Sequence, residues 1–129
     1  MSIAPKAELI HAIEAYFQEV DRFDTDAIMA YFVDDCVMEI VNYAVRHEGM
    51  DTIRGVYDAR AGRVQSSWHG DFQHTVDEDE GRVATRLIVR RTNADGSTEE
   101  MENLTLFVLE KLKIRHLSIW MSGENTLTD

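Results

Sequence analysis

The sequence predicts an α+β fold in which three amino-terminal helices pack on a curved, antiparallel-rich sheet and form a cone-shaped α+β barrel. Two patterns carry this prediction. Apolar residues recur at three- and four-residue spacing in the first half, whereas the chain after Ser66 is rich in β-branched residues interrupted by turn signals. Because 129 residues suit one hydrophobic core and no repeat or linker interrupts them, we expect a single domain over residues 1–129.

Three helices are expected in the first half of the chain. The first should begin at Pro5, because the N–H that proline lacks would have no partner in a first turn. Its buried face is marked by Leu9, Ile10, Ile13, Tyr16, Phe17 and Val20. Asp24 or Thr25 can cap a short second helix, and Asp51 can cap a third. The third helix should bury a face that carries Ile53, Val56 and Tyr57.

The strands are expected to follow two short segments, 36–41 and 45–49, and then a meander of four long strands after Ser66. Turn signals separate the long strands at residues 79–81, 93–96 and 111–113, of which the last contains no glycine. A sheet of this length twists and should curl around the helices. A conical cavity would remain, and such cavities are the usual binding sites for small molecules.

Composition excludes several functional classes. The formal net charge of -11 disfavours a nucleic-acid partner, since phosphate would be repelled over most of the surface. No apolar run approaches the roughly eighteen residues of a membrane span, and residues 1–6 do not resemble a signal peptide. The single cysteine, Cys36, allows no intrachain disulfide. We therefore expect a cytoplasmic protein with no nucleic-acid and no membrane partner.

No cofactor or metal is predicted. The sequence has no Cys-x-x-Cys pair, no Gly-rich phosphate loop and no Gly-x-Ser-x-Gly elbow. Glu8 and His11 have a spacing that can hold a metal, but they lie mostly off the apolar stripe and favour a solvated row. His69 and His74 are five residues apart and would point to opposite faces of a strand, unless a bulge intervenes.

Three segments resemble the nuclear-transport-factor-2-like (SnoaL-like) superfamily: YFQEVDRFDTDAI at 16–28, YFVDDCV at 31–37 and HEGMDTIR at 47–54. The segments follow one another in the same order and with similar spacing as in members of that superfamily, and the similarity extends over nearly the whole chain. The resemblance implies a curved sheet wrapped with helices around one apolar pocket. It does not imply one function, because this superfamily includes isomerases, dehydratases, cyclases, transport factors and plain ligand binders.

The resemblance also suggests site residues. Tyr16 falls on the tyrosine that donates to an enolate in ketosteroid-isomerase-like members, but their general-base aspartate falls on Ile40 and their second acid near Thr105. Chemistry by that route is therefore not expected. In scytalone-dehydratase-like and dehydrochlorinase-like members an aspartate after the first helix pairs with a histidine of the third strand. Asp21 and His69 fall at those positions.

These residues suggest a cofactor-independent lyase or isomerase. If the Asp21 carboxylate accepts the Nδ1–H of His69, it makes Nε2 a general base for elimination or a double-bond shift. Tyr16 would donate to the developing oxyanion. The competing interpretation is structural: Asp21 ends a helix, His69 is a loop or core histidine, and Tyr16 is a core aromatic. The domain would then be a non-catalytic ligand-binding or scaffold protein.

The ligand is expected to be small and apolar or aromatic. The residues predicted to bind it are Ile13, Phe17, Met38, Ile40, Asn103, Thr105, Phe107 and Trp120. In the strand that contains Asn103, the opposite face is also apolar, through Leu104, Leu106 and Val108. That outer face needs a cover, so we expect a homodimer through it, as the resemblance also implies.

Overall fold

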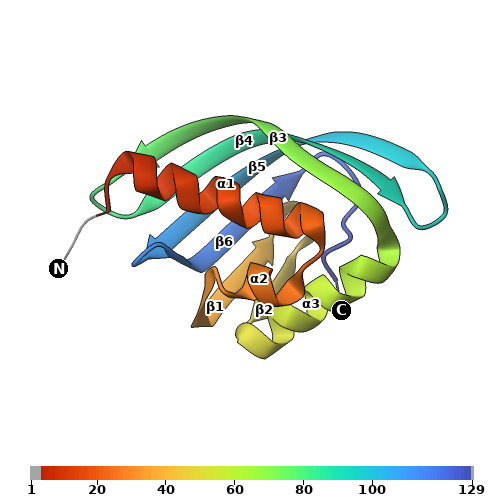
Figure 1. Ribbon diagram of the computed structural model, residues 1–129, viewed down its shortest axis with the longest axis horizontal. Coiled ribbons are helices and arrows are strands. Elements are labelled where there is room, and N and C mark those ends of the chain that lie inside the picture. The colour runs from red at the N-terminus through yellow and green to blue at the C-terminus, as the bar shows by residue number, and fades with distance from the viewer. Residues whose placement is uncertain (1–3, 129) are drawn as a thin grey trace.

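The computed structural model describes residues 4–128 and confirms the α+β class, with helices packed against one curved, mixed sheet (Figure 1). The helices are α1 (Lys6–Arg22), α2 (Thr25–Met29) and α3 (Met50–Arg63). The strands are β1 (Phe32–Ile40), β2 (Val45–Glu48), β3 (Val64–Asp77), β4 (Arg82–Asn93), β5 (Thr98–Glu110) and β6 (Lys113–Met121), with a 3₁₀ turn, η1, at Val41–Tyr43.

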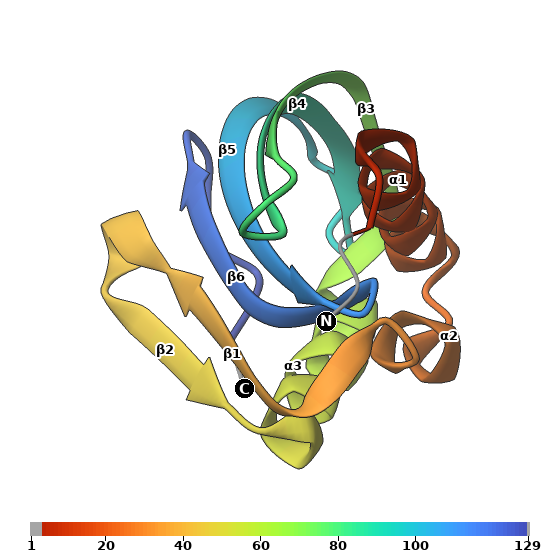
Figure 2. The ribbon, with the colours of Figure 1, turned by 90° about the vertical axis from the view of Figure 1, so that its left-hand side faces the viewer.

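The strand order is β2-β1-β6-β5-β4-β3. The four long strands form the expected antiparallel meander, and β1 joins it by pairing parallel with β6. Figure 2 shows the sheet curled around its concave side, where the helices lie. The edge strands β2 and β3 do not pair with each other, so the sheet stays open, and α1 packs against β3.

Helix α1 follows the predicted apolar spacing. It begins after Pro5 and buries Leu9, Ile13, Tyr16, Phe17 and Val20 against the sheet. Phe23 ends the helix in a left-handed conformation with φ 58°. The next turn is capped as predicted, since the side chain of Asp24 accepts a hydrogen bond from the backbone N–H of Ala27 at 3.1 Å. Helix α2 therefore begins directly after the turn that ends α1.

A β-bulge in β3 changes which side chains face α1. The register with β4 shifts between Gly70 and Gln73, and Asp71 within the bulge has φ 53°. As a result His69 and His74 both point towards α1, where each contacts a carboxylate. Opposite faces were expected for a regular strand unless a bulge intervened, and the bulge in β3 brings both histidines to one face.

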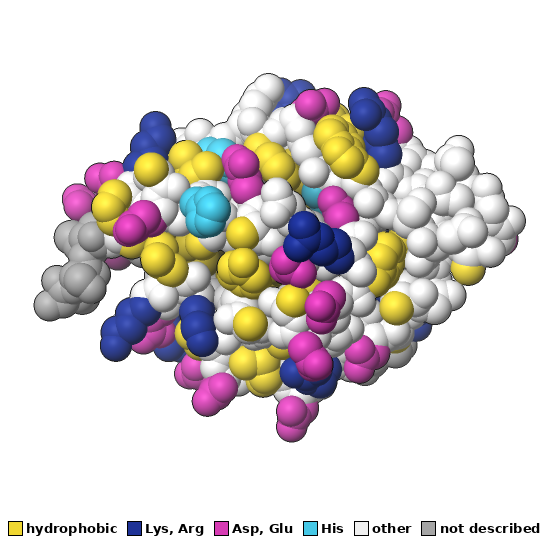
Figure 3. Space-filling model, in the orientation of Figure 1, with side chains coloured by type: hydrophobic (Ala, Val, Ile, Leu, Met, Phe, Trp, Pro, Cys, Tyr) yellow, Lys and Arg dark blue, Asp and Glu magenta, His cyan; other side chains and the backbone are white. Residues whose placement is uncertain are grey.

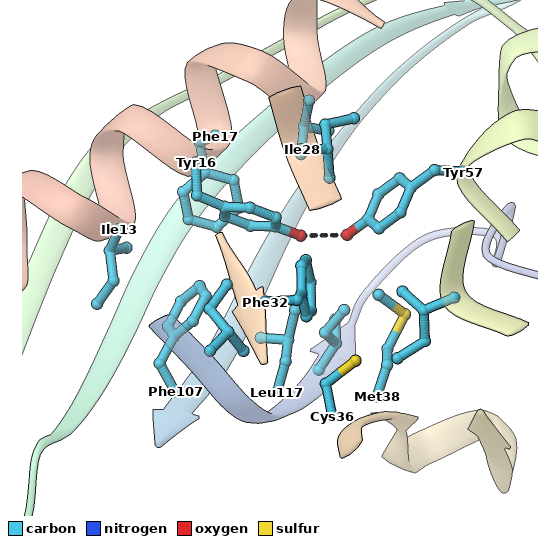
Figure 4. Close-up of a cluster of buried hydrophobic side chains, with 14 of the residues drawn as sticks. Ile13, Tyr16, Phe17, Ile28, Phe32, Cys36, Met38, Tyr57, Phe107 and Leu117 are labelled. Atoms are coloured by element: carbon cyan, nitrogen blue, oxygen red, sulfur yellow. Dashed lines mark hydrogen bonds between the residues drawn. The ribbon is translucent and has the colours of Figure 1, made fainter. Parts of the chain in front are cut away.

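The two faces of the sheet differ. The concave face and the helices enclose a continuous cluster of buried apolar and aromatic side chains (Figure 4). On the convex face Leu104 and Trp120 lie opposite each other on neighbouring strands and are 46% and 38% exposed. Acidic, basic and apolar side chains are intermingled over the side that carries α1 (Figure 3). None of the helices in residues 4–128 has the length and apolarity to cross a membrane.

Candidate active site

Asp21 and His69 meet at the seam between α1 and β3. The Nδ1 atom of His69 lies 2.6 Å from Oδ1 of Asp21, and the backbone N–H of His69 donates to Oδ2 at 2.9 Å. Ser67, two residues earlier on the same face of β3, donates its hydroxyl to Oδ1 at 2.8 Å. Both carboxylate oxygens are therefore engaged, and the imidazole is held in one orientation.

The surroundings keep the imidazole neutral near pH 7. The side chain of His69 is 11% exposed and that of Asp21 is 21% exposed. Burial lowers the pKa of His69, and the hydrogen bond that His69 donates to Asp21 acts in the opposite direction without outweighing it. With Nδ1–H donated to the carboxylate, Nε2 carries the free lone pair. No residue of the described chain forms a hydrogen bond with Nε2. The pair can therefore accept a proton.

Four stacked rings run along the same seam. Phe17 stacks on His69 with ring centroids 5.0 Å apart, Phe72 stacks on Phe17 at 5.4 Å, and His74 stacks on Phe72 at 5.7 Å. His74 closes the column with its own acid, since its Nε2 lies 2.7 Å from Oε2 of Glu14. The seam thus has an acid–histidine pair at each end and apolar rings between them.

A hollow of about 380 Å³ opens onto this seam. We call it the seam hollow, and it is lined by Glu14, Phe17, Gln18, Asp21, Arg22, Trp68, His69 and Phe72. Its volume lies in the usual range for small-molecule sites, and it combines aromatic walls with a few polar groups. A small substrate in the seam hollow would contact the imidazole of His69 directly.

Tyr16 does not reach the seam hollow. Its hydroxyl forms a short hydrogen bond with the hydroxyl of Tyr57 from α3, inside the core (Figure 4). Burial raises the pKa of Tyr16 well above its usual value, and the neighbouring Tyr57 raises it further. Burial also raises the pKa of Tyr57 to about 12. Both phenols stay protonated at physiological pH and can act only as neutral hydrogen-bonding groups.

Most residues predicted to bind the ligand belong to the core instead. Five of them lie in the buried cluster: Ile13, Phe17, Met38, Ile40 and Phe107. Besides the seam hollow, one hollow lies at the surface of β3, β4 and β5 and another lies beside the start of α1. Of the eight predicted ligand residues, only Phe17 borders one of these three hollows. The apolar pattern therefore marked positions that are buried in the core.

The remaining three predicted ligand residues have different surroundings. Thr105 is buried and donates its hydroxyl to the carbonyl oxygen of Thr85 at 3.2 Å. Asn103 is buried on the same face of β5, and its Oδ1 has no hydrogen-bond partner. Trp120 lies on the convex face, because its neighbours Ile119 and Met121 alternate with it and face the core. The placement of Trp120 on the pocket wall is therefore wrong.

Sequence reasoning did not assign Ser67 to this site, and it gave no role to the buried polar groups of Tyr57 and Arg60 in the neighbouring core. Tyr57 and Arg60 follow the apolar face of α3 at helical spacing, and a basic residue on a buried face was a signal that could have been used. Ser67 gave no signal, because its role depends on where α1 ends. Within residues 4–128 no group of three or more His, Cys, Asp or Glu side chains is arranged to hold a metal.

Comparison with known proteins agrees with the fold. The model of the SnoaL-like domain family matches residues 13–117. An epoxide hydrolase from M. tuberculosis described as LEH-like superposes with a TM-score of 0.77 at 20% identity, covering 90% of this chain and 84% of that one. The epoxide hydrolase/cyclase-like enzyme SalBIII, with a role in pyran ring formation in the polyether salinomycin, gives 0.77 at 20% identity, covering 91% and 92%.

A third similar structure is PrhC from Penicillium brasilianum, with a TM-score of 0.81 at 14% identity, covering 91% of this chain and 82% of that one. At these low identities the superpositions show a shared fold and nothing more. The sequence matches none of the curated proteins with which it was compared. The family model spans most of the chain, including the aspartate at the end of α1 and the histidine of β3. The chain belongs to the SnoaL-like domain family.

Proposed function

We propose that the protein is a cofactor-independent lyase or isomerase that removes a proton from a small apolar or aromatic substrate bound in the seam hollow. One observation carries the proposal: three hydrogen bonds fix the carboxylate of Asp21. Two are donated by His69, from Nδ1 and from its backbone N–H, and the third is donated by the hydroxyl of Ser67. This arrangement leaves Nε2 of His69 free beside a space of about 380 Å³.

The reaction begins when Nε2 of His69 accepts a proton from an activated C–H bond. The imidazolium that forms is stabilised by the carboxylate of Asp21, which holds the Nδ1–H at 2.6 Å. The proton is then returned to a leaving group, which completes an elimination, or to another carbon, which completes a double-bond shift. Tyr16 would stabilise an oxyanion only by exchanging its partner Tyr57 for the substrate oxygen.

The proposal is tested with 5-nitrobenzisoxazole, a planar aromatic probe of general-base catalysis. Loss of its ring C–H proton to Nε2 breaks the N–O bond and gives a nitrile and a coloured phenolate, so turnover is followed by absorbance. The wild-type protein should accelerate this reaction over buffer and over free imidazole. His69→Ala should reduce the rate about 10²–10⁴-fold, the usual contribution of a positioned base.

His116→Ala is the matched control, because His116 also contacts a carboxylate, that of Glu39, but lies on β6 away from the seam. It should keep the wild-type rate. Full turnover in His69→Ala would refute the assignment of the base. Failure of the wild-type protein to exceed imidazole would favour the second candidate, a non-catalytic ligand-binding or scaffold domain. The packing of most predicted ligand residues in the core supports that candidate.

We also propose that the protein forms a homodimer through the convex face of the sheet. Leu104 and Trp120 are exposed side by side on that face, and no helix of the described chain covers them. Leu104→Lys should convert a dimer to a monomer in analytical ultracentrifugation. Asp58→Lys, a charge change at an exposed site on α3, away from the convex face, should not. A wild-type monomer at high concentration would refute the dimer.

A further inference from the structure

Arg60 is a buried cation in the interior of the protein. It lies on the core-facing side of α3, with Ile53, Val56 and Tyr57, and is 5% exposed. Burying a charged group is costly unless it gains a partner of opposite charge or a full set of hydrogen bonds. A buried arginine is therefore expected to have its five N–H groups well used.

The guanidinium of Arg60 is only partly used. One nitrogen, NH1, donates to the carbonyl oxygen of Val20 at 3.4 Å, and Cζ lies 4.9 Å from the centre of the Phe23 ring. No carboxylate of residues 4–128 forms an ion pair with it. The other two nitrogens of Arg60 have no hydrogen-bond partner, but they are not fully enclosed. Among the side-chain nitrogens and oxygens of residues 4–128, only Oδ1 of Asn103 is both enclosed and without a partner. These nitrogens are therefore donors without a partner inside the described chain.

The second buried arginine shows what a satisfied guanidinium looks like in this protein. Arg91, on β4, is 7% exposed and donates twice to Glu99, at 3.0 and 2.7 Å. It also donates to the hydroxyl of Thr126 at 3.2 Å and to the carbonyl oxygen of Glu124 at 2.6 Å. Arg91 has an internal carboxylate and Arg60 does not. Arg60 therefore keeps N–H donors for a carboxylate that comes from outside the protein.

Arg60 is within electrostatic reach of the candidate base. Burial lowers the pKa of Arg60, whereas Tyr57, Tyr16 and Asp21 raise it. In return, the positive charge of Arg60 contributes to the lowered pKa of His69. The contact of NH1 with the carbonyl oxygen of Val20 also places the guanidinium beside the residue that precedes Asp21, whose carboxylate holds His69. An anion bound to Arg60 would therefore lie near the imidazole.

We propose that Arg60 binds the carboxylate of a small monocarboxylic acid with an apolar or aromatic body, and so holds that acid next to His69. The planar guanidinium matches a carboxylate in shape and charge. A single free guanidinium suits one negative charge, because Arg91 is already neutralised by Glu99. The catalytic consequence rests on the proposed function, whereas the binding itself does not.

A purely structural role makes a different prediction. The contact with Val20 places a positive charge at the carboxyl end of α1, where cations stabilise a helix. In that role Arg60 would affect stability and show no preference between a carboxylic acid and its neutral analogue. Ligand selectivity therefore separates the two roles.

The probes are benzoate, its neutral analogue benzamide, and phenyl phosphate as a dianion, each titrated calorimetrically into the full-length protein. The wild-type protein should bind benzoate at least about tenfold more tightly than benzamide, the usual effect of a charge-assisted hydrogen bond. Arg60→Met should abolish this preference, and Arg60→Lys should keep part of it. Arg54→Met, which removes a partly exposed arginine of the same helix that is paired with Asp26, should leave it unchanged.

A second readout does not depend on a variant that folds. In the wild-type protein, benzoate should shift the NMR signal of the Arg60 Nε–H group, assigned through its bonds to the Arg60 backbone signals, and benzamide should not. Equal binding of benzoate and benzamide, tighter binding of phenyl phosphate, or a benzoate preference that survives in Arg60→Met would each overturn the proposal.

The failure of the two proposals can be told apart. His69→Ala should keep the benzoate preference while losing turnover of 5-nitrobenzisoxazole. A wild-type protein that shows the Arg60-dependent preference but no turnover would refute the lyase or isomerase function and support the carboxylate site.

Discussion

Ser67 donates its hydroxyl at 2.8 Å to the same carboxylate oxygen of Asp21 that contacts the imidazole of His69. The two β3 residues are two positions apart, so their side chains leave the strand on the same face. The carboxylate is held from the strand side by both of them and by the backbone N–H of His69. The orientation of the imidazole thus depends on a contact that has no role in proton transfer itself.

Ser67→Ala should lower turnover of 5-nitrobenzisoxazole about tenfold, because the carboxylate loses a charge-assisted hydrogen bond worth about 1.5 kcal/mol. The imidazole and its contact with Asp21 remain, so activity should not be lost. Steady-state absorbance kinetics measure the effect. Ser66→Ala, which changes the neighbouring hydroxyl on the other face of β3, is the control. An unchanged rate in Ser67→Ala would show that the Asp21 carboxylate is positioned without Ser67.

Asp21→Asn should have a larger effect, a loss of about 10²–10⁴-fold in turnover. An amide NH₂ group facing Nδ1 favours the tautomer in which Nε2 carries the hydrogen, and the imidazole then has no lone pair for the substrate. The variant should fold, since the amide has nearly the same shape. Measurement of the rate together with the circular dichroism spectrum separates loss of base function from loss of structure. A rate like that of Ser67→Ala would argue against a tautomer role.

The pH dependence of turnover follows from the lowered pKa of His69. The base is active only when neutral, so the rate should rise as pH increases through a pKa below 6.5 and stay level above it. An inflection above 6.5 would mean that the contact with Asp21 outweighs burial, and would contradict the neutral imidazole described above.

The same shift predicts how stability changes with pH. Between the folded-state pKa of His69 and 6.5 the unfolded chain binds the proton more readily, so the free energy of unfolding should fall as pH decreases through this window. His69→Gln lacks the titrating group and should lose less stability over the same interval. Urea denaturation at about pH 7.5 and 5.5 compares the two proteins.

The sequence predicted the elements well because their spacing is set by local burial. The stripe from Leu9 to Val20 and the alternation along β5 match the structure, as does the turn at Lys111 and Leu112, which both take positive φ without glycine. Asp21 and His69 were paired through resemblance to a known family, not through spacing. Their distance of 2.6 Å depends on where α1 ends against β3, which no local pattern specifies.

The remaining site could not be read from local patterns. Apolar alternation marks a buried face but does not separate a filled core from a ligand wall, so the pattern alone did not reveal that Ile40 and Phe107 lie in the buried cluster. Trp120 belongs to a strand with apolar residues on both faces, where alternation leaves the inner face undefined. The bulge at Asp71 and the contact of Tyr16 with Tyr57 depend on tertiary packing.

The phenol pair inside the core predicts a non-additive response to mutation. Tyr57→Phe leaves the buried hydroxyl of Tyr16 without its partner, which should lower the free energy of unfolding by about 1–3 kcal/mol. The double variant with Tyr16→Phe removes both hydroxyls and should recover part of that loss. A double-mutant cycle from chemical denaturation measures the coupling. Strictly additive losses would show that the two hydroxyls do not depend on each other.

Asn103 carries a cost that a single substitution should relieve. Its Oδ1 is enclosed and has no partner, and an unpaired buried polar atom costs about 1–3 kcal/mol. Asn103→Leu replaces the amide with an apolar group of similar shape between Leu87 and Met121, its partners on the neighbouring strands. The variant should therefore be at least as stable as the wild-type protein. Its free energy of unfolding should be about 1 kcal/mol higher if removal of the amide nitrogen has no cost of its own.

Thr105→Val is the contrasting case, because it removes a hydroxyl that already donates to Thr85 and should destabilise the protein. Urea denaturation of both variants decides the point: a clear loss of stability in Asn103→Leu would mean that Oδ1 is bound by water in solution, and the polar atom would then mark a hydrated position in the concave face.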